Sequence, residues 1–265
     1  MLDPESRTLK LSQGSVRKKP FAFCCVIAVV VSAFIYAEID LAALLAAGPD
    51  FIRFFVSNFL PPSFDNIGTY LPLILQTIMF AVTGTYISAV LAFFFGLLLS
   101  EKTNPVVWLR MTVLAVMSFL RNVPVLVWTA LLVYIFGIGN MVGLIALVLA
   151  TLGFLSRSYA ESINQIPNEK FDALKASGAS YLQVLFHGII PAFIPSWLNW
   201  TLFSFEINIR ASAVLGMVGA GGIGIMIQTN IRLFRYHEAL SLVIILTSLV
   251  LLTEFITNKL RAAIK

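Results

Sequence analysis

Residues Glu169–Pro191 read EKFDALKASGASYLQVLFHGIIP and form the most polar window after residue 160, between two long apolar runs. The pattern predicts two short helices separated by a break of small residues at Ser177–Ser180, with the second helix ending at Pro191. Asn168 is the expected N-cap, and Glu169 falls in the first turn, where the positive end of a helix favours a carboxylate. One helix face carries apolar residues at roughly helical spacing and is predicted to dock into a partner's groove: Phe171, Leu174, Leu182 and Leu185.

The composition indicates an all-α integral membrane protein. Hydrophobic residues make up 59% of the chain, charged residues make up 12%, and the mean hydropathy is +0.92, whereas soluble domains carry about twice that charge. The net charge of +5 does not indicate that the chain binds nucleic acid, because the basic residues cluster at the ends of apolar runs, as in membrane proteins. The adjacent Cys24 and Cys25 lie inside the first apolar run and suggest neither a disulfide nor a metal site.

The spacing of the apolar runs predicts about six membrane-spanning helices with both termini in the cytoplasm. Residues 1–20 would form a cytoplasmic tail, and the run from Phe21 to Ala37 would form the first span. A cleaved signal peptide is the alternative for this run, but no convincing cleavage site follows it. The remaining polar part of the 21–71 region is expected outside the membrane, with LAALLAAG and FIRFFVSNFL as two short amphipathic helices and Pro61-Pro62 ending the second.

Residues 72–260 are expected to form the transmembrane domain, with its cytoplasmic coupling loop at 161–190 and a tail at 261–265. The expected spans are Pro72–Leu99, a helix that RNVP introduces and that ends near Phe136, Met141–Ser156, Pro191–Leu215 and Glu238–Lys259. Along the first of these, a ridge of small residues (Gly84, Ser88, Ala92, Gly96) predicts close packing against another span or subunit. Arg232 and Arg235 are expected in an external loop.

The sequence contains no pattern that predicts catalysis or a metal site. No G-x-x-x-x-G-K-[ST] motif is present, so ATP hydrolysis is not expected of this chain. Gly219–Gly224 matches the dinucleotide-binding pattern G-x-G-x-x-G, but that site requires a preceding strand, and here the preceding run is a membrane helix. The glycines Gly219, Gly221, Gly222 and Gly224 are instead expected to break the helix, with exposed N–H groups that could meet an anion.

Two ionisable residues inside the predicted Pro191–Leu215 span are candidates for the translocation pathway. Glu206 and Arg210 lie one helical turn apart, and counting residues from Pro191 places them in the outer half of the membrane. Charged groups there either pair with each other or line a polar path, so both interpretations stay open: a structural ion pair, or an Arg210 that meets an anion. Ser212 is a further pathway candidate, and Asn208 is expected to form a helix–helix hydrogen bond.

The segment DALKASG-x9-GIIP, Asp172–Pro191, closely resembles the EAA motif of ABC importer permeases. Ala173, Gly178 and Pro191 match the motif, and Asp172, Leu174 and Ile190 are mild departures from it. The resemblance covers the chain from about residue 55 to the end. Glu161, FLPPSF and FEINIRASAVLGMVGAGGIG (Phe205–Gly224) are similar to the membrane subunits of phosphonate importers.

The resemblance implies a type I ABC importer permease fold in the bacterial inner membrane. It implies a homodimer with two separate ATPase subunits, which bind ATP and Mg²⁺, and a soluble substrate-binding protein outside; this chain itself would bind no cofactor. The expected coupling residues are Glu169, Asp172, Ala173, Gly178, Ala179 and Pro191. The expected cargo is phosphonate, phosphite or phosphate. The alternatives are an ABC permease for methionine or an amino acid, and a secondary transporter.

Overall fold

The computed structural model describes residues 18–38 and 40–264, which divide into two units, 1–57 and 58–265. The expected cytoplasmic tail at 1–20 lies outside the described residues as far as residue 17, and so does Lys265 at the other end. In the first unit, α1 spans Lys18–Tyr36 and is followed by α2, Leu41–Phe59, which continues into the second unit. The expectation of two short helices after residue 38 is wrong: α2 is one helix of 19 residues, and Pro49 lies inside it.

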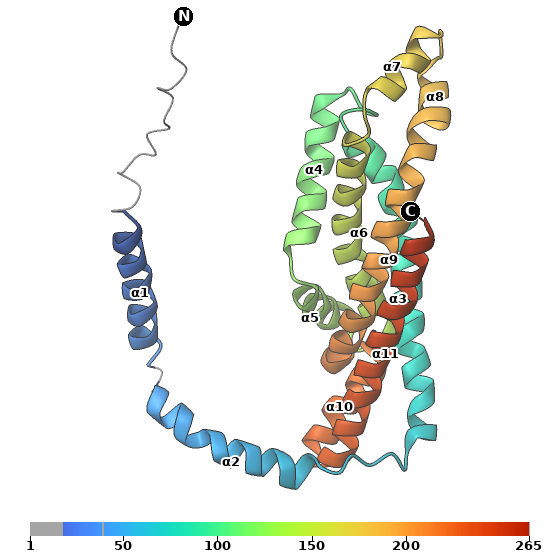
Figure 1. Ribbon diagram of the computed structural model, residues 1–265. Coiled ribbons are helices and arrows are strands. Elements are labelled where there is room, and N and C mark those ends of the chain that lie inside the picture. Colours follow the sequence, from blue (N-terminus) through green and yellow to red (C-terminus); the bar gives the residue numbers. More distant parts are fainter. Residues whose placement is uncertain (1–17, 39, 265) are drawn as a thin grey trace, which may run out of the picture. The chain divides into compact units, whose positions relative to one another are not determined.

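The second unit is a helical bundle with the two short helices α7 and α8 at one end and α10 at the other (Figure 1). Its long helices are α3 (Ile67–Leu99), α4 (Val107–Asn122), α6 (Asn140–Asn164), α9 (Ile190–Leu215) and α11 (Tyr236–Ile264). The shorter helices are α5 (Val125–Phe136), α7 (Glu169–Ala176), α8 (Tyr181–Val184) and α10 (Ile223–Arg232), and two π-helical stretches, η1 (Leu185–Ile189) and η2 (Gly216–Ala220), flank α9. Arg232 therefore ends helix α10 and does not lie in a loop.

Four continuous helical stretches in the described chain are long and apolar enough to cross a membrane: Ile67–Leu99, Asn140–Asn164, Tyr181–Ala220 and Tyr236–Ile264. The sequence predicted two further spans. The first, Phe21–Ala37, corresponds to the shorter apolar stretch Phe23–Tyr36 of α1. In the second, which leads to Phe136, α4 and α5 meet at an angle of 88°. The bend falls at Pro124, which lacks a backbone N–H and so cannot continue a helix of regular hydrogen bonds. Because α5 alone has 12 residues, about 18 Å at 1.5 Å per residue, it is too short to cross by itself.

The predicted ridge of small residues on α3 packs against α6, which confirms the packing seam. All four ridge residues are buried, and the Ser88 hydroxyl donates to the Val148 carbonyl at 3.2 Å. A Cβ added at Gly84 would lie 2.8 Å from a Leu147 side-chain carbon, and one added at Gly96 would lie 2.8 Å from the Tyr159 Cβ. The two helices therefore approach as closely as glycine allows.

Asn208 joins three helices at the centre of the bundle, as the sequence predicted for a helix–helix hydrogen bond. Its amide nitrogen donates to the Thr85 hydroxyl of α3 at 2.8 Å, and its amide oxygen accepts from the Thr151 hydroxyl of α6 at 2.9 Å. All three side chains are buried. An unpaired polar group inside a membrane protein is costly, so this network fixes the positions of α3, α6 and α9 relative to one another.

Candidate functional site

The segment 169–191, called here the two-helix segment, turns sharply after α7. Gly178 adopts φ of +86°, its N–H donates to the Lys175 carbonyl at 2.9 Å, and the Ala179 N–H donates to the Leu174 carbonyl at 3.1 Å. This pair of bonds is the Schellman motif, which places glycine at the left-handed position. The prediction of a break here is confirmed. Asn168 does precede the helix, but its side chain makes no cap hydrogen bond.

The second helix begins with a capping box that the sequence analysis missed. The Ser180 hydroxyl accepts from the Gln183 N–H at 3.4 Å, and the Ser180 N–H donates to the Gln183 side-chain oxygen at 2.7 Å. Ser-x-x-Gln before an apolar run is the sequence signature of this motif and could have found it. Because only Ala179 separates Gly178 from the capping serine, the turn between α7 and α8 has little freedom.

The second helix of the segment does not end at Pro191, contrary to the prediction. Helical structure runs through Pro191 from Tyr181 as far as Val218, and the left-handed Gly219 then breaks it. A proline lacks the N–H that would bond the carbonyl one turn earlier, and here the wider π-helical turn of η1 immediately precedes it. The exposed Pro191 therefore lies in the first turn of α9, and α8 is physically continuous with the membrane span.

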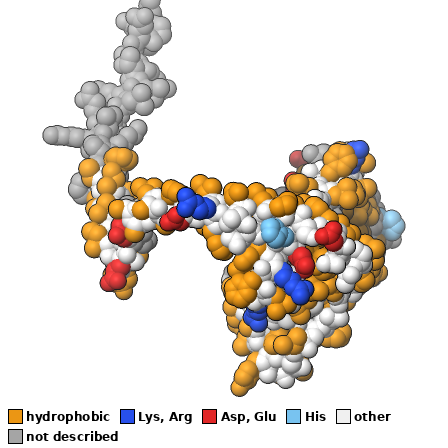
Figure 2. Space-filling model, turned by 90° about the horizontal axis from the view of Figure 1, so that it is seen from below, with side chains coloured by type: hydrophobic (Ala, Val, Ile, Leu, Met, Phe, Trp, Pro, Cys, Tyr) orange, Lys and Arg blue, Asp and Glu red, His pale blue; other side chains and the backbone are white. Residues whose placement is uncertain are grey.

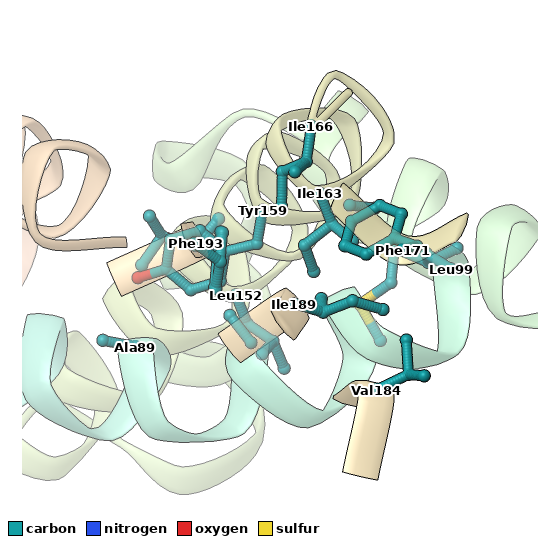
Figure 3. Close-up of a cluster of buried hydrophobic side chains, with 14 residues drawn as sticks. Ala89, Leu99, Leu152, Tyr159, Ile163, Ile166, Phe171, Val184, Ile189 and Phe193 are labelled. Carbon is teal, nitrogen blue, oxygen red and sulfur yellow. The ribbon is translucent and has the colours of Figure 1, made fainter. Parts of the chain in front are cut away.

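The apolar side chains of the two-helix segment divide between an inner and an outer face. Phe171 is buried in the bundle's main hydrophobic cluster together with Ile163, Leu99 and Ile189 (Figure 3), and Leu174 and Leu185 pack against the same cluster. The predicted docking face is therefore wrong for these three residues, because they anchor the segment to its own bundle. The large apolar side chains that remain exposed are Tyr181, Leu182 and Phe186 of α8 and η1, at 53%, 60% and 59%.

Gly188, absent from the predicted site, lies close against the end of the Leu174 side chain where the segment folds onto itself. A Cβ added there would lie 2.8 Å from a terminal carbon of Leu174. The predicted residues Glu169, Asp172, Ala173 and Gly178 are all exposed on this segment, and Ala179 is half-buried. Asp172 and Ala179 also line a cavity of about 410 Å³ that lies against Glu101 and Lys102 of the α3–α4 loop. The structure thus gathers the predicted coupling residues at one end of the bundle.

The proposed pair of Glu206 with Arg210 does not form. The Glu206 carboxylate instead pairs with Arg261 near the end of α11 and accepts from the Thr257 hydroxyl. Because α8 and η1 extend this helix beyond Pro191 at its cytoplasmic end, Pro191 does not mark the membrane surface, and counting from it misplaced these residues. Arg261 follows the start of α11 by 25 residues, about 38 Å along a helix, so Glu206 lies toward the predicted cytoplasmic side and not in the outer half.

Arg210 is exposed on α9, and no described carboxylate lies within ion-pair distance of it. It belongs to an exposed stripe that is otherwise apolar, called here the α9 stripe: Phe203, Ile207, Arg210, Val214, Met217 and Val218. Ser212 points the other way: it is buried, and its hydroxyl donates to the Thr77 carbonyl of α3 at 3.3 Å or to the Ile209 carbonyl at 2.9 Å. The structure therefore separates Ser212 from Arg210.

The glycine run breaks the helix, as predicted, and two of its N–H groups are bonded to α3 rather than free for an anion. Gly219, Gly221 and Gly222 have φ of +102°, +85° and +74°, a region that other residues rarely adopt. The Gly222 N–H donates to the Gln76 side chain at 2.9 Å, and the Ile223 N–H donates to the Thr77 hydroxyl at 2.9 Å. The run 219–224 is therefore a turn docked on α3, called here the glycine turn.

The end of the bundle that carries α10 shows acidic and basic side chains beside a histidine, among apolar surface (Figure 2). Glu238 accepts a hydrogen bond from the Tyr70 hydroxyl at 3.1 Å and lies 4.0 Å from Arg235. The imidazole Nδ1 of His237 lies 2.8 Å from the Pro61 carbonyl. Among residues 18–38 and 40–264, no group of three His, Cys, Asp or Glu side chains could hold a metal ion.

The chain is similar to permease subunits over most of its length. It is 31% identical over 234 residues to the phosphate-import permease protein PhnE of Mycolicibacterium smegmatis, covering 88% of this chain but only 44% of that relative. It is 28% identical over 240 residues to the phosphite transport system permease protein PtxC of Stutzerimonas stutzeri, covering 91% of this chain and 87% of that relative.

A solved structure of the MetNI methionine ABC transporter in an inward-facing conformation shares the fold, with a TM-score of 0.67 and 22% identity over 77% of this chain and 99% of that one. The family described as binding-protein-dependent transport system inner membrane component matches residues 92–265, well over half of the chain. The chain therefore belongs to this family of multi-pass inner-membrane transport components.

Proposed function

We propose that this chain is the membrane-spanning subunit of an ATP-driven importer for a phosphorus oxyanion: phosphonate, phosphite or phosphate. The observation that carries the proposal is the two-helix segment, an exposed element that is rigidly capped and continuous with a membrane span. The relatives support the substrate class, because the proteins at 28 to 34% identity are named for phosphate, phosphite or phosphonate transport.

The proposed complex contains two copies of this chain, two ATPase subunits and one soluble binding protein. ATP and Mg²⁺ are assigned to the ATPase subunits, because this chain has no phosphate-binding loop of the G-x-x-x-x-G-K-[ST] type. The chain itself is not an enzyme in this scheme. It supplies the path through the membrane and the surface on which the ATPase acts.

The ATPase contact is assigned to Leu182 and Phe186, whose exposed side chains lie one helical turn apart. An apolar helix face of this kind docks into a groove on a partner protein. Since α8 continues through η1 into α9, a push on these side chains acts directly on the membrane span. The Schellman turn and the capping box stabilise the segment against local unfolding, so that movement of the ATPase is transmitted to α9.

The anion path is assigned to the α9 stripe. A lipid-facing arginine near the centre of a span costs about 2.5–3.5 kcal/mol, and Arg210 has no carboxylate partner among the described residues. The stripe is therefore better placed against the second copy, around a polar path that the two copies share. A guanidinium is well suited to a phosphorus oxyanion, since its planar donors match two oxygens at once.

The rival reading is a permease for methionine or an amino acid, and a relative named as a glutamine permease matches at 26% identity. The lower identity of that relative and the unpaired cationic Arg210 favour an anionic cargo. A secondary transporter is the weaker alternative, because it has no use for an ATPase contact at the two-helix segment.

The test is ATP hydrolysis and uptake by the purified complex in proteoliposomes, with the binding protein loaded with phosphonate, phosphite, phosphate or methionine. We expect a phosphorus anion to stimulate hydrolysis and to be taken up, and methionine to do neither. Leu182→Glu should abolish stimulation by placing a charge at the ATPase contact, whereas Leu182→Ile should keep it. Stimulation by methionine alone would overturn the substrate class, and uptake driven by an ion gradient without an ATPase would overturn the whole proposal.

A further inference from the structure

The loop between α3 and α4, residues 100–106, contacts the end of α6 and α7. The Asn164 side-chain oxygen accepts from the Ser100 hydroxyl at 2.6 Å and from the Glu101 N–H at 3.0 Å. The Lys102 ammonium donates to the Ile166 carbonyl and lies 5.3 Å from the ring centre of Phe171. One lysine thus joins the α3–α4 loop both to the chain just after α6 and to the anchoring side chain of α7.

A second tie runs from the same loop to α8. The Tyr181 hydroxyl donates to the Thr103 backbone carbonyl. Between the two ties lies the cavity of about 410 Å³ lined by Lys102, Asp172, Lys175 and Tyr181. Because this space is not filled by packed side chains, the connection between the loop and α8 depends on a few polar contacts rather than on an extended interface.

The other end of α3 holds the glycine turn. Gln76 and Thr77 accept the N–H groups of Gly222 and Ile223, and a Cβ added at Gly222 would lie 2.7 Å from the Thr77 hydroxyl oxygen. Between the loop and this contact, α3 packs on α6 along the glycine seam at Gly84 and Gly96. One stiff helix therefore connects the two-helix segment to the turn where the α9 stripe ends.

We infer that the α3–α4 loop is a strap that makes α3 follow the two-helix segment, so that movement at the ATPase contact reaches the glycine turn through α3 as well as through α9. Lys102 and Tyr181 are the positioning residues at the inner end, and Gln76 and Thr77 are those at the outer end. The inference rests on the proposed function, because it needs an ATPase that moves the two-helix segment. Because both α3 and α9 would transmit the movement, α9 and the glycine turn would change conformation together rather than one after the other.

The test removes single ties in the complete complex in proteoliposomes, with the same phosphorus anions as cargo. Tyr181→Phe deletes only the hydroxyl that reaches Thr103, and Lys102→Met deletes the ammonium but keeps much of the side chain's length. Tyr134→Phe is the matched control, because that ring is 92% exposed on α5. We expect both strap variants to keep the ATPase subunit bound and to hydrolyse ATP within about twofold of wild type, while anion uptake per ATP falls at least severalfold.

A readout that needs no cargo separates failure of the strap from failure of the proposed function. Spin labels at Glu101→Cys and Ser177→Cys, in a chain with Cys24→Ser and Cys25→Ser, report the distance from the loop to the two-helix segment. With the strap intact we expect the same distance with and without ATP, and with Tyr181→Phe and Lys102→Met combined we expect it to change. An ATP-dependent change already in the intact strap would overturn the inference, as would unchanged distance and unchanged uptake per ATP in the combined variant. Absence of any ATPase partner would overturn the proposed function and the inference together.

Discussion

At the scale of single residues, backbone geometry and not side-chain chemistry sets the strictest requirements. Gly224 faces the Ala213 carbonyl so closely that no Cβ fits there. Gly178 has open space around it, and only its φ of +86° requires glycine at this position. The two glycines look alike in the sequence, but they are required for different reasons: close packing in one case and a left-handed turn in the other.

This difference predicts that Gly224→Ala disrupts the fold, because the added methyl group collides with backbone that cannot rotate away. We expect loss of the folded monodisperse peak, or a fall of more than about 10 °C in the thermal midpoint, measured by size-exclusion chromatography of detergent-solubilised protein after heating. Gly68→Ala is the control, since its Cβ would meet nothing within 4 Å. Equal stability of the two variants would contradict the close approach.

The sequence patterns predicted the positions of turns better than they predicted the partners in ion pairs. The turn at Gly178 and the break at 219–224 could be predicted from the sequence, because glycine is the residue that most readily adopts a positive φ. The Glu206 partner could not, because the residue one turn away on the same helix was an equally good candidate as the distant Arg261. Ion pairs between helices depend on how the helices cross, and that is fixed by packing along whole faces.

At the scale of helices, the contact of α9 with α11 predicts different roles for Glu206 and Arg210. The Glu206 and Arg261 side chains are mostly buried, at 12% and 22% exposure. Glu206→Gln leaves the Arg261 charge without its counter-ion, so we expect a loss of about 3 kcal/mol in stability, which Glu206→Gln combined with Arg261→Gln partly restores. Thermal unfolding of the detergent-solubilised chain measures both.

Arg210→Gln, by contrast, breaks no ion pair among the described residues and should leave the thermal midpoint within about 2 °C of wild type. Anion uptake should nevertheless fall. A large loss of stability in Arg210→Gln, with none in Glu206→Gln, would reverse the assignment of a structural role to Glu206 and a pathway role to Arg210.

The helix boundaries also show where sequence reasoning stops. The seam of Gly84, Ser88, Ala92 and Gly96 was predictable because small residues at every fourth position form a ridge on any helix. The continuity of α8 with α9 was not, because a proline usually marks a boundary, and the π-helical turn before Pro191 has no signature of its own. For the same reason the 88° bend between α4 and α5 could not be predicted, because a proline such as Pro124 is found both at the start of a span and at a bend between two helices.

At the scale of the whole molecule, the α9 stripe predicts the contact between two copies of the chain. An isologous dimer brings the same residue of each copy together at its axis. In a chain with Cys24→Ser and Cys25→Ser, we expect Val214→Cys on the stripe to form a dimer with a short bifunctional maleimide in native membranes. Leu251→Cys on α11 should remain monomeric because it lies off the stripe, although Leu251 is more exposed in this chain than Val214, at 61% against 43%.

The crosslink also bears on the charge of the path, because two copies joined along the stripe bring two Arg210 side chains toward one another. Like charges that share a dry region repel, so the arrangement is stable only when an anion or water lies between them. We therefore expect phosphate to accelerate the Val214→Cys crosslink and Arg210→Gln to remove that effect. Dimers that form equally from Leu251→Cys, or a rate indifferent to phosphate, would place the anion path elsewhere than on α9.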